Sequence, residues 1–362
     1  MKVGIVGLPN VGKSTLFNAL TKSYGAEVGN FPFCTIDPNV GIVNVNDERL
    51  EKISKVVNTQ KIIPATVEFV DIAGLVAGAS KGEGLGNKFL ANIRETDAIL
   101  QVVRGFEDEN VHHVNGEINP KKDIEIINSE LIIADLETLE RKMGDNGRKA
   151  KSGDKECIKK QEIYEKLKPH LEAGNLAITL DIPAEDRIFL KDSHFLTNKP
   201  FIYAVNLLET DLMMSENDLR NLIGITDKNI KVVPISAKLE YDMLELTEEE
   251  RKEFLVDLGL TFNPVDVLIK TCFDALGLQY YFTAGEIEAR AWTIRKGALA
   301  PEAAGEIHTD FQKKFIKAEV VNWEDLLDSG SFTEARSKGK VKMEGKDYVM
   351  QDGDVVLFKI GG

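Results

Sequence analysis

Short apolar runs alternate with helical patterns through the first two-thirds of the chain. Val, Ile and Phe dominate six of these runs with little polar alternation, which is typical of strands in a sheet covered on both faces. The six runs are Lys2 to Val6, Val40 to Val45, Thr66 to Val70, Ile99 to Val103, Phe201 to Val205 and Lys231 to Ile235. Because helical segments separate them, we expect an α/β domain with a doubly wound, mostly parallel sheet.

A charged helical stretch, from about residue 123 to 197, interrupts this alternation. Two apolar stripes run along it at helical spacing, Ile132, Leu136, Leu139 and Met143 in the first and Cys157, Tyr164, Leu167 and Leu171 in the second. The segment from Gly144 to Lys155 is predicted to be an exposed, mobile tip between two helices. We therefore expect an antiparallel helical hairpin inserted in the α/β domain, and ordinary surface helices packed on the sheet are the alternative.

After Leu278 the pattern changes to that of a small mixed domain, plausible as a β-grasp sheet with a covering helix. Strands are predicted at Arg290 to Ile294, Ala318 to Val321, Asp347 to Met350 and Val355 to Ile360, and helices after Ala300 and Trp323. The expected division is an α/β domain over 1–122 and 198–278, the helical insert over 123–197 and the C-terminal domain over 279–362.

The composition is that of a globular protein, with 43% apolar and 29% charged residues among 362. The net charge of −14 argues against a globally basic nucleic-acid coat. Three cysteines without C-x-x-C spacing exclude a Cys-rich zinc site and suit a reducing cytoplasm. We find no signal peptide and no apolar stretch of the ~18 residues that span a membrane.

The clearest chemical motif is GLPNVGKST, Gly7 to Thr15. It satisfies G-x-x-x-x-G-K-[ST] directly after a predicted strand and directly before a helix, the arrangement whose backbone N–H groups surround phosphate oxygens. Lys13 is expected to reach the β- and γ-phosphates, and Ser14 to bind Mg²⁺. Asn10 could contact the nucleotide or help to hold a monovalent cation. The residues of this loop that we expect at the nucleotide are Asn10, Val11, Gly12, Lys13, Ser14 and Thr15.

Two further elements stand where a P-loop GTPase-like domain needs them. Thr35, in NFPFCT, precedes the second predicted strand, where a Thr can bind Mg²⁺ and sense the γ-phosphate. The string DIAG, Asp71 to Gly74, ends the third predicted strand in the D-x-x-G form. We expect Asp71 to contact Mg²⁺ through water and the Gly74 N–H to meet the γ-phosphate.

The residue that follows DIAG departs from the usual GTPase pattern. It is Leu75, where many GTPases have a Gln that orients the attacking water. Because a Leu side chain cannot orient water, hydrolysis must be slow or another group must replace the Gln.

The base-reading motif departs as well. Where N-K-x-D normally ends the fifth strand, this chain has Asn206-Leu207-Leu208-Glu209. Losing the Asp removes the carboxylate that pairs with guanine, and with it the discrimination against other bases. Adenine becomes a reasonable ligand, with Asn206 and the backbone around Leu207 at its edge and Leu207 and Leu208 on its face.

A second base-flanking loop follows the sixth predicted strand. Ser236, Ala237 and Lys238 match the S-A-K sequence that usually lies beside the base. We therefore expect Ser236 and Ala237 at the nucleotide together with Asn206 and Leu207.

These motifs together resemble the YchF/Obg-like ATPase family, a group of TRAFAC-class P-loop NTPases. The resemblance rests on GLPNVGKST, NFPFCT, DIAGLVAGASKGEGLGNKFL, NLLE, SAK and a C-terminal IHTDF, and it covers nearly the whole chain. It implies an OBG-type G domain, a coiled-coil-like helical insert and a C-terminal TGS domain of β-grasp type. It also implies Mg²⁺-dependent, slow hydrolysis of ATP, with ATP used as well as or in preference to GTP. The partner it implies is the ribosome, by its large subunit, or translation factors.

The resemblance also implies a replacement for the missing Gln. In this family a hydrophobic residue takes the place of the Gln, as Leu75 does here, and a His in the loop after the fourth strand is assigned its role. The stretch FEDENVHHVNG matches that loop, and His113 aligns with the family His, while the neighbouring His112 leaves open which ring acts. The implied catalytic residues are thus His113 and Lys13.

The charge is unevenly spread along the chain. Residues 279–362 hold 12 Lys and Arg against 14 Asp and Glu, a net charge of −2, so most of the acidity lies elsewhere. Two local basic clusters stand out: Arg336, Lys338, Lys340 and Lys342 in the C-terminal domain, and Arg148, Lys149 and Lys151 at the helical tip. Such clusters are either solvated surface or contacts to RNA phosphates or ribosomal protein.

Three functions stay open at this stage. The first is a Mg²⁺-dependent P-loop ATPase, the second a nucleotide-gated ribosome-binding module in which hydrolysis is incidental, and the third a true GTPase. Turnover with and without ribosomes separates the first two, and relative affinity for ATP and GTP tests the third.

Overall fold

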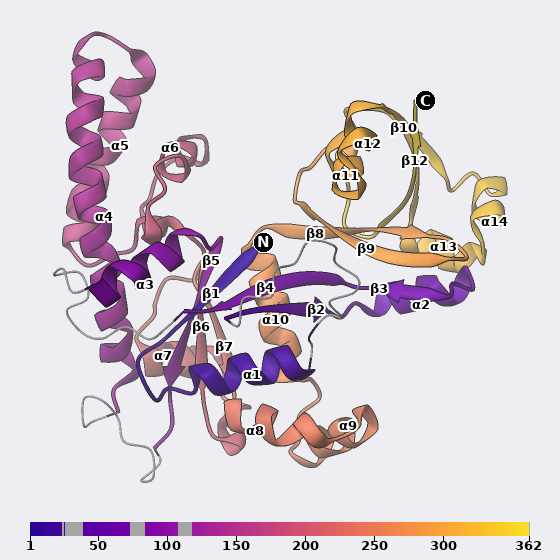
Figure 1. The fold of residues 1–362 in the computed structure, drawn as a ribbon, viewed down its shortest axis with the longest axis horizontal. Helices are drawn as coiled ribbons and strands as arrows, with labels where there is room; N and C mark the ends of the chain where they lie inside the picture. The colour runs from indigo at the N-terminus through magenta and orange to yellow at the C-terminus, as the bar shows by residue number, and fades with distance from the viewer. Residues whose placement is uncertain (24, 26–38, 73–83, 108–117, 362) are drawn as a thin grey trace. The chain divides into compact units, whose positions relative to one another are not determined.

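A computed structural model describes residues 1–23, 25, 39–72, 84–107 and 118–361. Its described residues fall into two compact units, the first within 1–25, 39–41 and 68–275 and the second within 42–67 and 276–361. Two six-stranded sheets organise the fold (Figure 1).

The first sheet has the strand order β2-β4-β1-β5-β6-β7. Its strands are β1 (Lys2–Val6), β2 (Val40–Val45), β4 (Ala65–Asp71), β5 (Ala98–Arg104), β6 (Phe201–Asn206) and β7 (Lys231–Ile235). The ladders β1–β4, β1–β5, β5–β6 and β6–β7 are all parallel, and every residue of β5 and β6 is buried. The predicted doubly wound sheet and its six strands are confirmed.

Helices lie between these strands and, after β7, follow the last of them. They are α1 (Lys13–Ser23), α3 (Gly84–Arg94), α7 (Glu216–Ile223), α8 (Ala237–Asp242), α9 (Glu248–Asp257) and α10 (Pro264–Ala275). Short 3₁₀ turns at Glu209–Asp211 and Met243–Glu245 complete this part. Because the strands in these four parallel ladders all run in the same direction, the loops that follow β1, β4, β6 and β7 lie at the same edge of the sheet.

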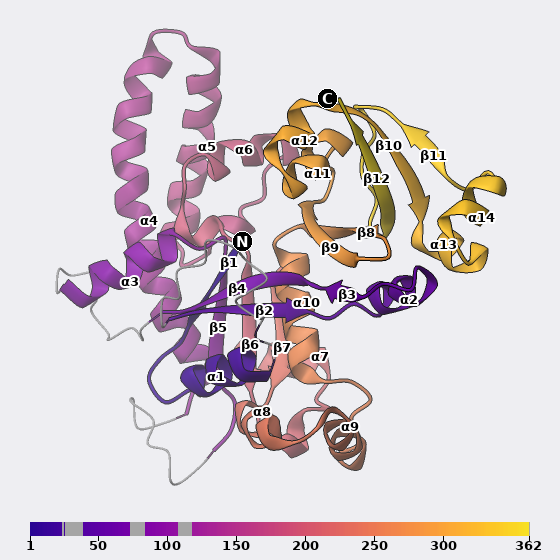
Figure 2. The ribbon, with the colours of Figure 1, turned by 45° about the vertical axis from the view of Figure 1, so that its right-hand side comes forward.

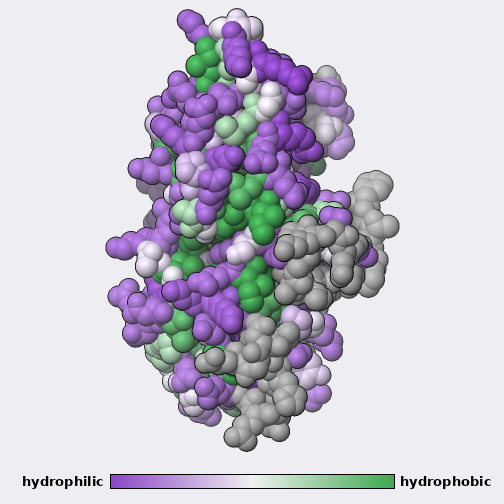
Figure 3. Space-filling view, turned by 90° about the vertical axis from the view of Figure 1, so that its left-hand side faces the viewer, coloured by the Kyte–Doolittle hydropathy of each residue, from purple (hydrophilic) through white to green (hydrophobic). Residues whose placement is uncertain are grey.

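The insert is a hairpin of two long helices, α4 (Pro120–Lys151) and α5 (Lys155–Glu172). Asn119 caps the start of α4 by accepting from the Lys122 N–H, with Pro120 in the first turn. Near its start α4 packs on the sheet, where Asn128 Nδ2 lies 3.1 Å from the Tyr203 hydroxyl, and further along it packs on α5. The predicted helical hairpin is confirmed. Figure 3 shows the molecule from the left-hand side of Figure 1, and hydrophilic side chains dominate that face.

The tip of the hairpin is shorter than the sequence predicts. Helix α4 continues through Gly144 to Lys151, so that residues 152–154 alone connect it to α5. Asn146 Nδ2 donates to the Cys157 carbonyl at 2.8 Å and to Gln161 Oε1 at 3.2 Å, which holds the end of α4 on its neighbour. These contacts help to offset the roughly 1 kcal/mol that each helical Gly costs.

A connecting segment returns from the hairpin to β6. It contains α6 (Arg187–Lys191) and 3₁₀ turns at Ala177–Thr179, Ala184–Asp186 and Leu196–Asn198. Asp135 of α4 ties it down, because its carboxylate accepts from the N–H groups of Leu196 at 2.7 Å and Thr197 at 2.8 Å and from the Thr197 hydroxyl at 2.7 Å. Its burial raises the pKa of Asp135, against the lowering effect of these donors.

The second sheet, in the C-terminal unit, has the order β11-β10-β12-β8-β9-β3. Its strands are β3 (Lys61–Ile63), β8 (Leu278–Ala284), β9 (Glu288–Arg295), β10 (Phe315–Asn322), β11 (Lys342–Glu344) and β12 (Asp354–Ile360). Helices α11 (Ala300–Ile307), α12 (Thr309–Lys313), α13 (Trp323–Ser329) and α14 (Phe332–Ser337) accompany them (Figure 2). Ala303 and Ala304 of α11 pack with Tyr281, Phe315 and Val356 in one core.

One predicted strand is wrong in this unit. Residues 347–350 form an isolated bridge, Leu299 to Val349, and the strand lies earlier, at Lys342–Glu344. The backbone there hydrogen-bonds to the loop before α11, with Met350 N–H donating to the Ala298 carbonyl at 2.9 Å, so its partner is a loop and not a long strand. Strand β8, before the first strand predicted in this domain, was missed.

Residues 42–67, which the sequence pattern groups with the α/β domain, contribute α2 (Glu48–Val56) and β3 to the second unit. Strand β3 pairs in parallel with β9. Arg49 of α2 binds Asp47 and Asp352, each at 2.7 Å, and its guanidinium lies 5.4 Å from the centroid of the Phe282 ring. An N-terminal segment is thus built into the C-terminal sheet.

Candidate nucleotide-binding site

The loop between β1 and α1 has the backbone conformation that its glycines predict. Gly12 has φ 94° and Asn10 φ 64°, both left-handed. A Cβ on Gly12 would collide with the Asn206 side chain, and one on Gly7 would lie 2.8 Å from Val11 Cγ2. Helix α1 then starts at Lys13, so its first N–H groups, which have no partner within the helix, face the loop.

Lys13 and Asp71 lie side by side at the edge of the first sheet from which the loops after β1 and β4 emerge. The Lys13 ammonium forms an ion pair with Asp71 Oδ1, and the two side chains are 11% and 19% exposed. Asp71 is held in place because its N–H donates to the Asn39 carbonyl at 2.8 Å. The loop after β1 and the end of β4 therefore bring a cation and a carboxylate together beside the exposed Ser14.

Asn206, at the end of β6, joins two loops of the site. It is 4% exposed, and its Nδ2 donates to the Val11 carbonyl at 3.0 Å while its Oδ1 accepts from the Ala237 N–H at 2.9 Å. Both ends of the amide are thus used in holding the phosphate loop against the S-A-K loop, where Ser236 caps α8.

The two leucines after Asn206 differ in exposure. Leu207 is 2% exposed and its N–H donates to the Ile235 carbonyl at 2.8 Å, whereas Leu208 is 46% exposed. Of the pair, Leu208 is therefore the one whose side chain is accessible from solvent, and the buried Leu207 side chain is not. The sequence signal for this exposure was that Leu208 lies in a loop after a buried strand.

Two buried charged residues near these loops were not singled out from the sequence. Arg104 ends β5 opposite Asn206 in the register, is 0% exposed, and donates from Nε to the Phe106 carbonyl at 3.1 Å. Glu240, in α8, is 2% exposed, and burial, with a further contribution from Asp266, raises its pKa to about 8. A charged residue at the end of a strand that is apolar apart from Gln101, as in AILQVVR, was the signal for Arg104.

The remaining predicted site residues lie outside the described residues: Thr35, Gly74, Leu75, His112 and His113. Among the residues that are described, no group of three or more His, Cys, Asp and Glu could hold a metal ion. The described donors near the loop, the Ser14 hydroxyl and the Asp71 carboxylate, are hard oxygen atoms. They fit Mg²⁺, which is usually bound by one or two side chains together with phosphate oxygens and water.

In the described part of the chain, no helix combines the length and the apolar character that a membrane span requires.

Two family models match the chain. Residues 2–135 match one described as "50S ribosome-binding GTPase", and residues 278–361 match YchF-GTPase_C, described as "Protein of unknown function (DUF933)". Among curated proteins, the chain is 50% identical to "Ribosome-binding ATPase YchF" of Bacillus subtilis over 362 residues, covering 99% of each chain. It is 51% identical to the protein of the same name from Escherichia coli O157:H7, covering 99% of this chain and 98% of that one.

Solved structures agree with this similarity. The YchF GTPase of Schizosaccharomyces pombe superposes with a TM-score of 0.88 at 39% identity, over 99% of this chain and 97% of that chain. A GTP binding protein from Pyrococcus horikoshii OT3 shares the fold, with a TM-score of 0.62 at 21% identity over the full length of both chains.

Proposed function

The chain belongs to the YchF family, and on that premise we propose that it is a ribosome-binding, Mg²⁺-dependent P-loop ATPase. The observation that carries the proposal is the ion pair of Lys13 and Asp71 at the mouth of a loop held by Asn206. Lys13, the cation for the phosphates, lies at the start of α1, and Asp71, the carboxylate for the water ligands of the metal, contacts it from the end of β4.

The chemistry that this arrangement suits is phosphoryl transfer from ATP to water, which rests on positioning and charge neutralisation. Lys13 and the N–H groups at the start of α1 would bind the phosphates, Ser14 and Thr35 would hold Mg²⁺, and Asp71 would orient its water ligands. When bound, Mg²⁺ would neutralise charge on the β- and γ-phosphates. Gly74 and His113 complete the proposal, with His113 orienting the attacking water where Leu75 cannot.

For base selection we propose that ATP is preferred over, or used alongside, GTP. Asn206 uses its amide to position the loops, and the Leu207 N–H is already bonded, which leaves the exposed Leu208 to pack on the base. Glu209 stands where a guanine-reading Asp would be. This set supports a site that does not select guanine.

Competitive titration of ATP and GTP, with purified protein and Mg²⁺, tests this proposal. A fluorescent ATP analogue is bound first and displaced by each nucleotide in turn. We expect ATP to displace it at a concentration equal to or lower than GTP. If GTP bound at least tenfold more tightly, the protein would be a true GTPase and the interpretation of NLLE would fail.

One structural observation favours the second candidate, a nucleotide-gated ribosome-binding switch. The stretch from Lys61 to Asp71 contains β3, which pairs with β9 in the second unit, and β4, which pairs with β1 and ends at the partner of Lys13. A single extended segment thus links the phosphate site to the C-terminal sheet through continuous backbone. Turnover that stays slow with ribosomes present, together with ribosome affinity that changes between ATP and ADP, would favour the switch.

For the partner, we propose the large ribosomal subunit or translation factors, met in the cytoplasm. RNA contact would use the C-terminal unit, proposed as a TGS domain over 279–362, or the basic end of the insert proposed over 123–197. Sedimentation of the protein with isolated 30S and 50S subunits tests the proposed large-subunit partner: we expect the protein to sediment with 50S subunits and not with 30S subunits.

A further inference from the structure

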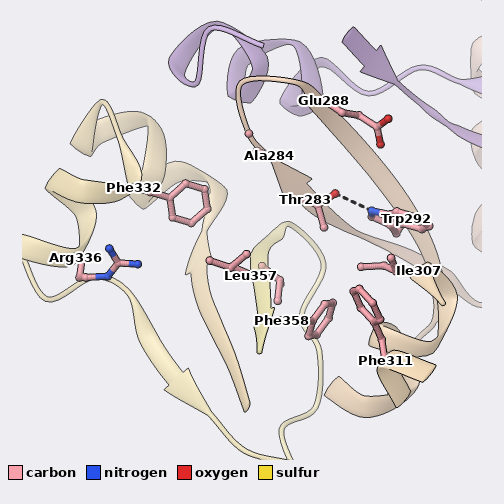
Figure 4. A pocket seen from close by; sticks show the side chains of 12 residues that line it. Thr283, Ala284, Glu288, Trp292, Ile307, Phe311, Phe332, Arg336, Leu357 and Phe358 are labelled. Carbon is pink, nitrogen blue, oxygen red and sulfur yellow. Dashed lines mark hydrogen bonds between the residues drawn. The ribbon is translucent and has the colours of Figure 1, made fainter. Parts of the chain in front are cut away.

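A cavity of about 530 Å³ lies within the second unit. Its wall contains Thr283, Ala284 and Gly285 from the end of β8 and Val356, Leu357 and Phe358 from β12. Side chains from β9, α11, α12 and α14 close it, namely Trp292, Ile307, Phe311, Phe332 and Arg336, with Glu288 at the rim (Figure 4). This volume lies in the range of protein sites that bind ligands.

The cavity exists because two neighbouring strands separate. Strand β8 continues to Ala284 and β12 to Ile360, yet the parallel ladder between them contains two residue pairs, Tyr281 with Asp354 and Phe282 with Val355. Beyond these pairs, each strand keeps its outer partner, β9 for β8 and β10 for β12. The inner edges of both strands therefore face the cavity.

A strand edge offers main-chain donors and acceptors, and a peptide in extended conformation satisfies them by adding a strand. Here two edges face one gap, and the open part of β12 that lines it, Val356 to Phe358, is three residues long. The main chain of the cavity wall thus suits a short extended segment better than a compact small molecule.

The side chains specify what such a segment would carry. Figure 4 shows Phe358 directed toward Phe311 and Ile307 on one side of β12, and Leu357 directed toward Phe332 and Arg336 on the other. An inserted strand would place alternate side chains on these two sides. Because both sides are lined mainly by apolar side chains, Arg336 excepted, the segment's residues within the cavity would be apolar, as in strands buried on both faces.

The charged residues next to the cavity indicate which residues should flank the apolar part of the bound segment. Arg336 is 56% exposed, and the chain from Arg336 to Lys342 contains four cationic residues and no acidic one. Glu319 already accepts from Arg336 at 2.5 Å and Asp325 pairs with Lys340 at 2.9 Å, so the excess positive charge lies in Lys338 and Lys342. A segment leaving the cavity on this side would be favoured by acidic side chains.

We propose that the cavity between β8 and β12 binds an extended segment of a partner protein, about three apolar residues followed by acidic ones. The proposal goes beyond the ATPase function and does not depend on it, since the cavity lies wholly in the second unit and binding requires no nucleotide.

The test is selection from a phage-displayed library of random twelve-residue peptides on the immobilised full-length protein, without nucleotide. We expect enrichment of a short apolar run followed by Asp or Glu. A synthetic, fluorescein-labelled consensus peptide is then titrated by fluorescence anisotropy against three variants. Selection that yields no consensus would overturn the proposal.

The three variants distinguish binding in the cavity from binding elsewhere on the sheet. Leu357→Glu places a charge on the wall at a residue that is 46% exposed, and should weaken the peptide at least tenfold. Arg336→Glu, on the exposed side of α14, adds a negative charge beside Glu319, and should weaken the peptide about fivefold and reduce the preference for acidic residues. Ile316→Glu, at a 56% exposed position of β10 outside the cavity lining, should leave affinity within twofold.

Two further results would contradict the inference. If the peptide bound Leu357→Glu and Arg336→Glu as tightly as the parent, its site would be elsewhere. If a single-stranded twelve-nucleotide RNA bound the same cavity variants with the expected losses and the peptide did not, the surface would recognise nucleic acid. Urea unfolding of each variant, followed by the fluorescence of Trp292 and Trp323 in the second unit, shows that this unit is folded.

Discussion

Glu240 makes the stability of the first unit depend on pH. It is 2% exposed in α8, directly after the S-A-K loop, and burial raises its pKa from 4.5 to about 8. Asp266 contributes to the rise, while Arg251 and the Val265 N–H act in the opposite direction. At neutral pH the native carboxyl therefore keeps its proton, whereas the unfolded one loses it.

The sign follows from which state binds the proton more tightly. Because the native pKa is higher, the stabilisation from the protonated carboxyl is complete below pH 4.5 and is lost as the pH rises toward 8. The difference between 4.5 and about 8 corresponds to roughly 4 to 5 kcal/mol at about 1.4 kcal/mol per pKa unit. Glu240→Gln replaces the neutral carboxyl by an amide of the same size that does not titrate.

The assay is urea unfolding of the parent and Glu240→Gln at pH 5, 7 and 9, with far-ultraviolet circular dichroism as the signal, because the long helices α4 and α5 lie in the first unit. We expect similar free energies of unfolding at pH 5 and a variant more stable than the parent by several kcal/mol at pH 9. A second variant, Asp266→Asn, should reduce the slope in part by removing one raising contribution. A difference between parent and Glu240→Gln that does not change with pH would refute the reasoning.

Three further predictions concern the nucleotide-binding site and residues 42–67, the N-terminal segment that belongs to the second unit. Asn206→Ala should raise the Kd for ATP at least tenfold, since it leaves the carbonyl of the phosphate loop and the Ala237 N–H without their buried partner, and an unchanged Kd by calorimetry would exclude the positioning role. His113→Ala should lower steady-state ATP hydrolysis without weakening ATP binding; unchanged turnover would remove His113 from the mechanism. Arg49→Met should destabilise the C-terminal sheet by about 1 kcal/mol, because it breaks the pairing to Asp352, whose side chain is 48% exposed. Hydrogen exchange of the β8 and β9 amides measures that loss, and the exposed Lys52→Met on the same helix is the control that should leave it unchanged.

Local patterns were sufficient for much of this protein. The string GLPNVGKST predicts a phosphate loop because its glycines permit left-handed backbone and its position follows an apolar strand, and the structure has both features. The six strands of the first sheet were predictable because strands covered on both faces must be apolar throughout.

Other features depended on partners distant in sequence. The glycines near 144–147 suggest a loop, yet Asn146 bonds to α5 and the helix continues. Residues 347–350 have the composition of a strand, but their backbone pairs with the loop before α11. In each case tertiary contacts outweighed a local preference that is worth about 1 kcal/mol per residue at most.

The sequence by itself therefore determined the family, the class of fold and the chemistry of the phosphate loop, all of which depend on residues close together in the chain. Only the tertiary structure decided that Asn206 uses both ends of its amide to join two loops, that residues 42–67 complete the C-terminal sheet, and that β8 and β12 separate to leave a cavity. The physical reason is that a hydrogen bond or a strand pairing between distant residues leaves no periodic pattern along the chain.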